Sequence, residues 1–231
     1  FISYIIFSHE LSYKSKLNAI EKNAFYDAGL ETILIPSKVT EIKDSAFIFC
    51  KFKTIEFAKN SHLKEIGKCA FEFSDLTCVI LPSRVTKLNK SVFSYCQELE
   101  KVEFDEKSNL KIIAENAFYK STVKIISIPS SIENLEDEWC SCTDYLREIK
   151  IFQTNKVNIK NYNDEFLIKK SVLKKDVFDI LIWSNFYITK VKIPSFIKII
   201  GPSAFEGHQH LTDVEFDENS QLEIISPRAF Y

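Results

Sequence analysis

One short pattern recurs along almost the whole chain: an aromatic residue, usually preceded by alanine, returns about every 21 to 25 residues. Residues 214–230 repeat residues 102–118 with eleven of seventeen positions identical. A period of this size is typical of solenoid proteins, in which each repeat forms one turn and stacks on the next. The recurring pairs are Ala24-Phe25, Ala46-Phe47, Ala70-Phe71, Val92-Phe93, Ala117-Phe118, Glu138-Trp139, Ala204-Phe205 and Ala229-Phe230.

Each repeat also contains the pattern of one short strand. In residues 30–47, Ile33 and Ile35 alternate with Thr32 and Leu34, as in a strand with one buried face. Pro36 follows and should end that strand, because proline has no amide hydrogen to donate. A single turn cannot bury its apolar side, whereas parallel stacking at about 4.8 Å per turn can. We therefore predict that the eight recurring aromatic rings form one buried column.

The consensus L-x-x-I-x-I-P-x-x-V-x-x-I-x-x-x-A-F-x-x-C resembles the repeat of the BspA-like leucine-rich repeat family over about residues 6–231. The resemblance implies a right-handed parallel β-solenoid of mostly short strands, with irregular or 3₁₀ connections and little α-helix. It also implies a surface antigen that acts in adhesion or ligand binding, and it assigns no catalytic residue. We interpret residues 1–231 as a single repeat domain. We also interpret the chain as a fragment of a longer protein, because it starts with Phe and contains no Met.

Residues 152–187 depart from this pattern and lack an Ala-Phe pair. Strands are expected near residues 166–172 and 179–183. The sequence leaves open whether they form a protruding hairpin or an irregular turn. Residues 173–176 read Leu-Lys-Lys-Asp and lack the glycine that a two-residue hairpin turn favours.

The bulk composition excludes several classes of function. A net charge of -2 gives no electrostatic reason to expect nucleic acid, and no apolar run approaches the ~20 residues of a membrane helix. No phosphate-binding loop, nucleophile elbow or zinc-protease motif is present. We therefore expect no enzyme, no cofactor and no membrane insertion by this segment. Gly (4) and Pro (6) are scarce, so Asn, Ser, Asp and Lys must form most turns.

Cysteine and histidine offer little sign of a metal site. Cys50, Cys96 and Cys142 each follow an aromatic residue by three positions, where other repeats carry Ala, Ser or, at His208, histidine. The position therefore favours a small buried residue, and we predict six free thiols with these three cysteines in line. His208 and His210 lie close in sequence, but zinc requires three or four ligands. Asn89 lies in a glycosylation sequon, a pattern that is frequent by chance.

The residues between the buried strand positions should face outward and stack into one continuous surface. They are Thr32, Leu34, Thr54, Glu56, Cys78, Ile80, Lys101, Glu103, Ile125, Ser127, Glu148 and Lys150. Leu34, Ile80 and Ile125 would be exposed apolar residues beside a mixed-charge half, a combination typical of protein interfaces. The alternative is that these side chains only pair up and down the sheet.

Two functional hypotheses follow from this pattern. The leading one is a non-catalytic protein-binding or adhesion module on the cell surface, which binds host or matrix proteins through the outward residues. The second is an intracellular, cytoplasmic scaffold that uses the same solenoid, because free cysteines suit a reducing compartment. The sequence identifies no particular partner for either.

Overall fold

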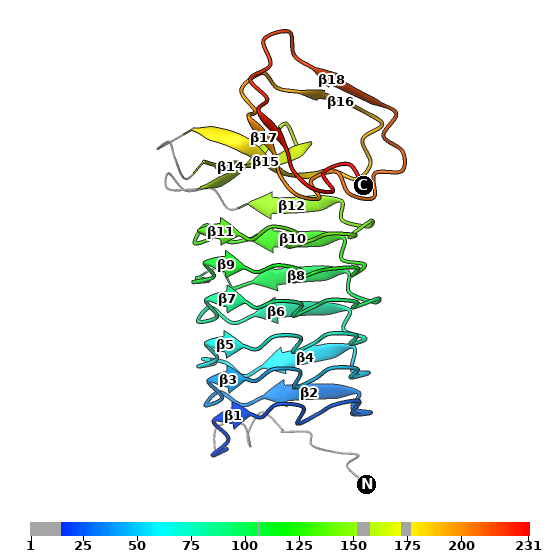
Figure 1. Ribbon diagram of the computed structural model, residues 1–231. Coiled ribbons are helices and arrows are strands. Elements are labelled where there is room, and N and C mark those ends of the chain that lie inside the picture. Colours follow the sequence, from blue (N-terminus) through cyan, green and yellow to red (C-terminus); the bar gives the residue numbers. More distant parts are fainter. Residues whose placement is uncertain (1–14, 106, 152–157, 172–176) are drawn as a thin grey trace.

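The chain folds into a parallel β-solenoid of about eight turns, with no helix in the residues that the structure describes (Figure 1). The computed structural model describes residues 15–105, 107–151, 158–171 and 177–231. The predicted fold is therefore confirmed. The turn expected at residues 173–176 lies outside the described residues.

Two ladders of parallel strands run along the stack as far as residue 151. The wide six-stranded sheet consists of β2 (Thr32–Ile35), β4 (Thr54–Phe57), β6 (Cys78–Leu81), β8 (Lys101–Phe104), β10 (Ile125–Ile128) and β12 (Glu148–Ile151). The narrow six-stranded sheet consists of β1 (Ala19–Ile20), β3 (Glu41–Ile42), β5 (Glu65–Ile66), β7 (Lys87–Leu88), β9 (Ile112–Ile113) and β11 (Asn134–Leu135). Equivalent residues of neighbouring repeats pair directly, for example Ile33 with Ile55 and Val79 with Val102.

The aromatic column forms the centre of the core. Phe47, Phe71, Phe93 and Phe118 are fully buried and stack nearly parallel at 5.4 to 5.6 Å between ring centroids. Each ring therefore fills the space between the rings of the two adjacent turns. The prediction that all eight rings are buried holds less well at the ends of the column. Phe25 is only partly buried and Phe230 is 39% exposed, because each stacks on one neighbouring ring.

Trp139 is buried as expected, but it occupies the alanine position of its repeat. The Phe118 amide donates to the Trp139 carbonyl, just as the Phe47 amide donates to the Ala70 carbonyl. Cys140 therefore takes the place of the ring. The larger indole reaches the core from the neighbouring position and meets Phe118 edge-on at 6.1 Å. The prediction that Glu138-Trp139 corresponds to an Ala-Phe pair was therefore wrong by one residue, because Trp139-Cys140 occupies these two positions.

Most aromatic corners place two residues, four positions apart, in the left-handed conformation. Ser45 has φ 56° and Phe49 has φ 61°, and the residues between them bond alternately within the turn and to the next turn. For example, the Ala46 amide donates to the Lys43 carbonyl, whereas the Phe47 amide donates to the Ala70 carbonyl. Asn, Asp, Ser and Lys fill seven of the fifteen left-handed corner positions of the described residues, so they are fewer there than the predicted majority. Left-handed residues are Asn23, Asp27, Ser45, Phe49, Cys69, Phe73, Ser91, Tyr95, Asn116, Lys120, Glu138, Cys142, Ser203, Gly207 and Arg228.

The irregular segment interrupts both ladders. β13 (Ile159–Tyr162), β14 (Phe166–Lys170) and β15 (Phe178–Ser184) pair antiparallel in sequence order. The strands expected near residues 166–172 and 179–183 are thus confirmed as β14 and β15 within the described residues. The hairpin between β13 and β14 was missed, although Asn163 and Asp164 both adopt left-handed conformations that these residue types tolerate.

Beyond this segment the solenoid resumes in new sheets. β15 continues in parallel with β17 (Ile199–Ile200) and β19 (Ile224–Ile225), and β16 (Lys190–Ile193) pairs with β18 (Asp213–Phe216). A second cluster of buried residues surrounds Phe166 and Phe205. Figure 1 shows β16 and β18 standing apart from β12, so the wide face of the stack is broken at this level.

Candidate functional site

The structure stacks the predicted outward residues into two columns on the wide sheet. Register pairs link Thr32 to Thr54, Leu34 to Glu56 and Ile80 to Glu103. Ile80 is 61% exposed, as expected for an outward residue in the middle of the sheet. Cys78, Glu56, Glu148 and Lys150 are also exposed, whereas Lys101, Glu103, Thr54 and Ile125 are partly exposed.

Two expected exposures are wrong. Leu34 is only 8% exposed and Ser127 only 6%, although both lie in register with outward residues. Strand alternation predicts the direction of a side chain but not what covers it. Ile125 is half-buried for the same reason, so Ile80 is the exposed apolar residue on which an interface could be built.

The charged half of the face is internally paired. The Lys101 ammonium lies 2.8 Å from the Glu103 carboxylate, and the Lys150 ammonium lies 3.5 Å from the Glu148 carboxylate. Exposed pairs of this kind contribute about 0 to 1 kcal/mol to stability, because water and salt screen them. Either pair could therefore break and form a salt bridge with a ligand at little cost. Without a ligand, the two pairs agree with the alternative that the outward side chains only pair with one another on the sheet.

A groove opens on this face between β4 and β6. The two strands pair only at Thr54 and Cys78, whereas β2–β4 and β6–β8 pair over four residues each. Figure 1 shows β4 and β6 farther apart than their neighbours. The resulting groove has a volume of about 970 Å³ and is lined by Glu56, Phe57, Ile80 and Arg84 among others. Sequence reasoning missed it, because both repeats carry ordinary strand patterns.

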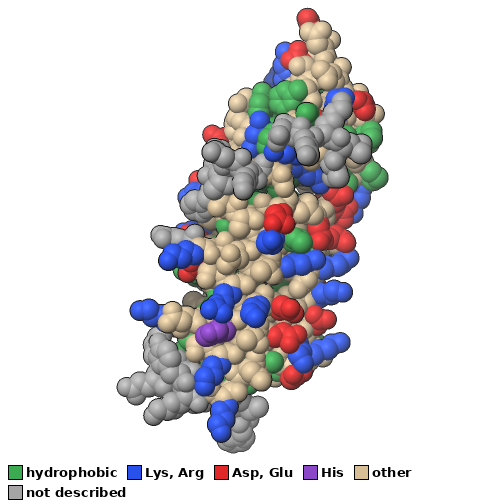
Figure 2. Space-filling view, turned by 90° about the vertical axis from the view of Figure 1, so that its left-hand side faces the viewer, with side chains coloured by type: hydrophobic (Ala, Val, Ile, Leu, Met, Phe, Trp, Pro, Cys, Tyr) green, Lys and Arg blue, Asp and Glu red, His purple; other side chains and the backbone are tan. Residues whose placement is uncertain are grey.

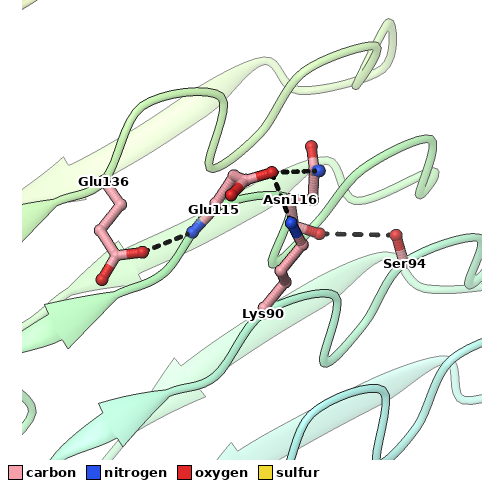
Figure 3. A network of polar contacts seen from close by, with 5 residues as sticks. All are labelled: Lys90, Ser94, Glu115, Asn116 and Glu136. Atoms are coloured by element: carbon pink, nitrogen blue, oxygen red, sulfur yellow. Dashed lines mark hydrogen bonds and ion pairs between the residues drawn. The ribbon is translucent and has the colours of Figure 1, made fainter.

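A different side of the stack carries Lys, Arg, Asp and Glu side chains of both signs scattered along its length (Figure 2). Near the narrow sheet, Lys43 pairs with Glu21 at 2.7 Å and Lys90 with Glu115 at 2.7 Å, in both cases between adjacent turns. Figure 3 shows one such network, in which the Glu136 carboxylate also accepts a hydrogen bond from the Glu115 amide at 3.0 Å. These contacts tie turn to turn, and we interpret this side as a solvated structural surface.

The buried thiols also have structural roles. The Cys50 and Cys96 thiols donate to the carbonyls of Phe25 and Phe71 in the preceding turn, at 2.9 and 3.1 Å. Burial raises the pKa of Cys50 to about 11 and that of Cys96 to about 12, which suppresses the reactive thiolate. All six cysteines are thiols in the structure.

The expected alignment of Cys142 with Cys50 and Cys96 is wrong. The shift at Trp139 places Cys142 at the left-handed corner position, with φ 55°, and Thr143 at the position of the small residue. Thr143 is buried and its hydroxyl donates to the Cys140 carbonyl.

His208 is largely buried, and burial lowers its pKa. Its ring nitrogens contact the carbonyls of Glu206 and Asn185. No group of three or more potential metal ligands occurs among the described residues. Within the same part of the chain, no helix is long and apolar enough to span a bilayer.

Comparison with known proteins identifies the repeat. The sequence model of the BspA type leucine rich repeat region matches six copies, over residues 18–147 and 176–231. Comparison with curated proteins finds no match. The chain is similar to the pneumococcal vaccine antigen PcpA, with a TM-score of 0.79 and 25% identity over 91% of this chain. It shares its fold with a leucine rich cell surface protein from Faecalibacterium prausnitzii, with a TM-score of 0.65 and 24% identity over 88% of this chain.

The chain spans 56% of the PcpA structure and 60% of the F. prausnitzii structure. The family match covers the regular stack and its resumption after the irregular segment, which are the parts whose registers repeat in the structure. Sequence pattern, architecture and comparison therefore agree that the chain belongs to the BspA-type leucine-rich repeat family.

Proposed function

We propose that this chain is a protein-binding module of the adhesion type, displayed at a cell surface, and that it binds its partner at the groove between β4 and β6. The observation that carries the proposal is Ile80, which is 61% exposed at the wall of this groove. An isoleucine in a central strand gains nothing from such exposure, whereas apolar residues surrounded by polar ones are typical of interface centres. Glu56 and Arg84 would supply the polar rim.

The surface location is supported by the solved relatives. One is described as a vaccine antigen and another as a cell surface protein. The partner would then be a protein of a host cell or of the extracellular matrix. We also infer that the module is not an enzyme, because leucine-rich repeats of this family are generally non-catalytic binding modules.

The intracellular scaffold remains the second candidate, and the six thiols favour it, since free cysteines persist in reducing compartments. Surface labelling of intact cells with an antibody against this chain separates the two. The surface proposal expects labelling without permeabilisation, and labelling only after permeabilisation contradicts it.

Replacement of Ile80 by Ser tests the binding face. We expect binding to host cells or immobilised matrix proteins to weaken at least about tenfold, because a central apolar contact of an interface typically contributes more than 1 kcal/mol. Ile224→Ser is the matched control, since Ile224 is 50% exposed on β19, away from the groove. Both variants should retain the circular dichroism of the original chain. Unchanged binding by a folded Ile80→Ser variant would place the site elsewhere.

A further inference from the structure

A small internal cavity lies where the regular stack meets the resumed solenoid. It has a volume of about 30 Å³. Its lining consists of residues 138–143 of the last regular turn, residues 182–184 at the end of β15 and residues 202–204 of the resumed solenoid, together with Phe186, Glu206 and His208. The cavity therefore lies between segments that are distant in the sequence.

Buried polar atoms without partners are concentrated around this cavity. Among the described residues, seven buried side-chain nitrogen or oxygen atoms have no hydrogen-bond partner, and five of them belong to residues that line it. They are Trp139 Nε1, Ser141 Oγ, Ser184 Oγ, Ser203 Oγ and Glu206 Oε2. Most buried polar groups in folded proteins are paired, because an unpaired group loses its hydration without a replacement. Five such atoms around one small cavity therefore indicate a partner that they share.

Hydrogen bonds hold the walls of the cavity in place. The Ser184 amide donates to the Ala204 carbonyl at 3.0 Å, and Glu206 Oε1 accepts from Arg228. In the regular stack, backbone amides of one corner donate to carbonyls of the next corner. At the joint, residues 138–143 and residues 202–204 both border the cavity, so a molecule inside it can link the two.

The mixture of donors and acceptors around the cavity selects the kind of molecule that fits. The Trp139 indole nitrogen can only donate, the Glu206 carboxylate can only accept, and a serine hydroxyl can do both. A metal ion or an ammonium ion cannot accept the hydrogen bond of the indole, and a halide cannot donate to the carboxylate. Water can do both, and a buried water typically has two to four polar partners.

The size of the cavity leads to the same ligand. A cavity needs about 10 to 15 Å³ to hold one water molecule, and a molecule of liquid water takes up about 30 Å³. The volume of about 30 Å³ therefore admits one or two water molecules. It is too small for an amino-acid side chain or a sugar.

We propose that this cavity is a buried water site, in which one or two water molecules bridge the last regular turn to the resumed solenoid. The water accepts from the Trp139 indole and donates to the Glu206 carboxylate, and the three serine hydroxyls complete its hydrogen bonds. These contacts come from the regular turn, from β15 and from the resumed solenoid. The water is therefore a structural part of the joint, and its role is independent of the groove at Ile80.

A high-resolution crystal structure of the unaltered chain tests this directly. We expect electron density for water at about 2.7 to 3.2 Å from at least three of the five atoms. Direct hydrogen bonds among the five side chains, or a dry cavity, would overturn the proposal. Anomalous scattering from crystals soaked in rubidium bromide should show neither ion at this position, and either ion there would also overturn it.

Relaxation dispersion of ¹⁷O-labelled solvent water counts the long-lived internal waters in solution. Ser184→Val should lower this count by one or two, because the valine methyl groups fill the cavity and a hydroxyl is lost. Ser74→Val is the matched control and should leave the count unchanged, since Ser74 is a buried serine of the regular stack whose hydroxyl contacts the Cys96 thiol at 3.4 Å. An equal count for Ser184→Val and the unaltered chain would overturn the proposal. The crystal structure of the unaltered chain decides the question if Ser184→Val does not fold.

Discussion

Replacement of Phe93 by Ala tests whether the aromatic column holds the stack together. Phe93 is fully buried and lies between Phe71 and Phe118, with centroid distances of 5.4 and 5.6 Å. The substitution removes a ring that contacts both adjacent turns, and the strand ladders on either side limit how far those turns can collapse into the cavity. We expect a loss of about 3 to 5 kcal/mol in the free energy of unfolding, as for other buried phenylalanines.

Phe230→Ala is the matched control. It deletes the same atoms, but Phe230 is 39% exposed and stacks on Phe205 alone, at 4.7 Å. Its cost should be about 1 to 2 kcal/mol, since only part of the ring is removed from water. The contrast between the two variants isolates the effect of a ring packed on both faces.

Urea unfolding followed by circular dichroism measures both losses. The urea midpoints of the two variants can be compared only if the slopes of the unfolding free energy against urea concentration are equal. Equal slopes are needed because a solenoid can unfold in parts when one turn is weakened. A lower slope for Phe93→Ala would mean that the stack has separated into two units. A cost for Phe93→Ala no larger than that for Phe230→Ala would refute the column as the main source of stability.

Three further outcomes are expected. In the native protein, a thiol reagent should modify the exposed Cys78 first and the buried Cys96 only after unfolding. In the denatured, unreduced chain the reagent should titrate six thiols, and a smaller number would reveal a disulfide bridge. Burial lowers the pKa of His208 from 6.5, so the unfolded chain binds the proton more tightly and the stability should fall as the pH drops below about 6.5. His208→Asn should flatten this dependence of the melting temperature on pH, and an unchanged dependence would contradict the prediction. Tyr95→Asn should change the free energy of unfolding by less than about 1 kcal/mol, because Asn tolerates the left-handed corner; a larger loss in urea unfolding would show that the ring is structural.

The repeat pattern predicted most of the fold because each of its positions has one structural task. Spacing alone located the middle of the ring column, most of the strand alternation and the small residue at Cys50 and Cys96. It failed at the ends of the column and at Leu34 and Ser127, which are buried. Trp139 shows where this reasoning fails. The pattern identifies an aromatic residue, but an indole is long enough to fill the ring's space from the adjacent position.

The candidate sites were harder to predict than the fold because they lie where the repeats are imperfect. The groove beside Ile80 depends on a loss of pairing between β4 and β6, which no residue type signals. A second cleft, of about 940 Å³, depends on how the irregular segment offsets the resumed solenoid, and it is lined by Asp144 and Glu206, which are 62 residues apart in the sequence. Local sequence contains neither relation.

Hydroxyl-radical footprinting of the chain, with and without a saturating matrix protein, tests the central claim most directly, because it reports the accessibility of individual side chains. The account predicts reduced oxidation of Ile80 and Phe57 at the groove, with no change at Ile224 on β19. Protection of Ile224, or of the charged side near the narrow sheet, without protection of Ile80 would contradict it.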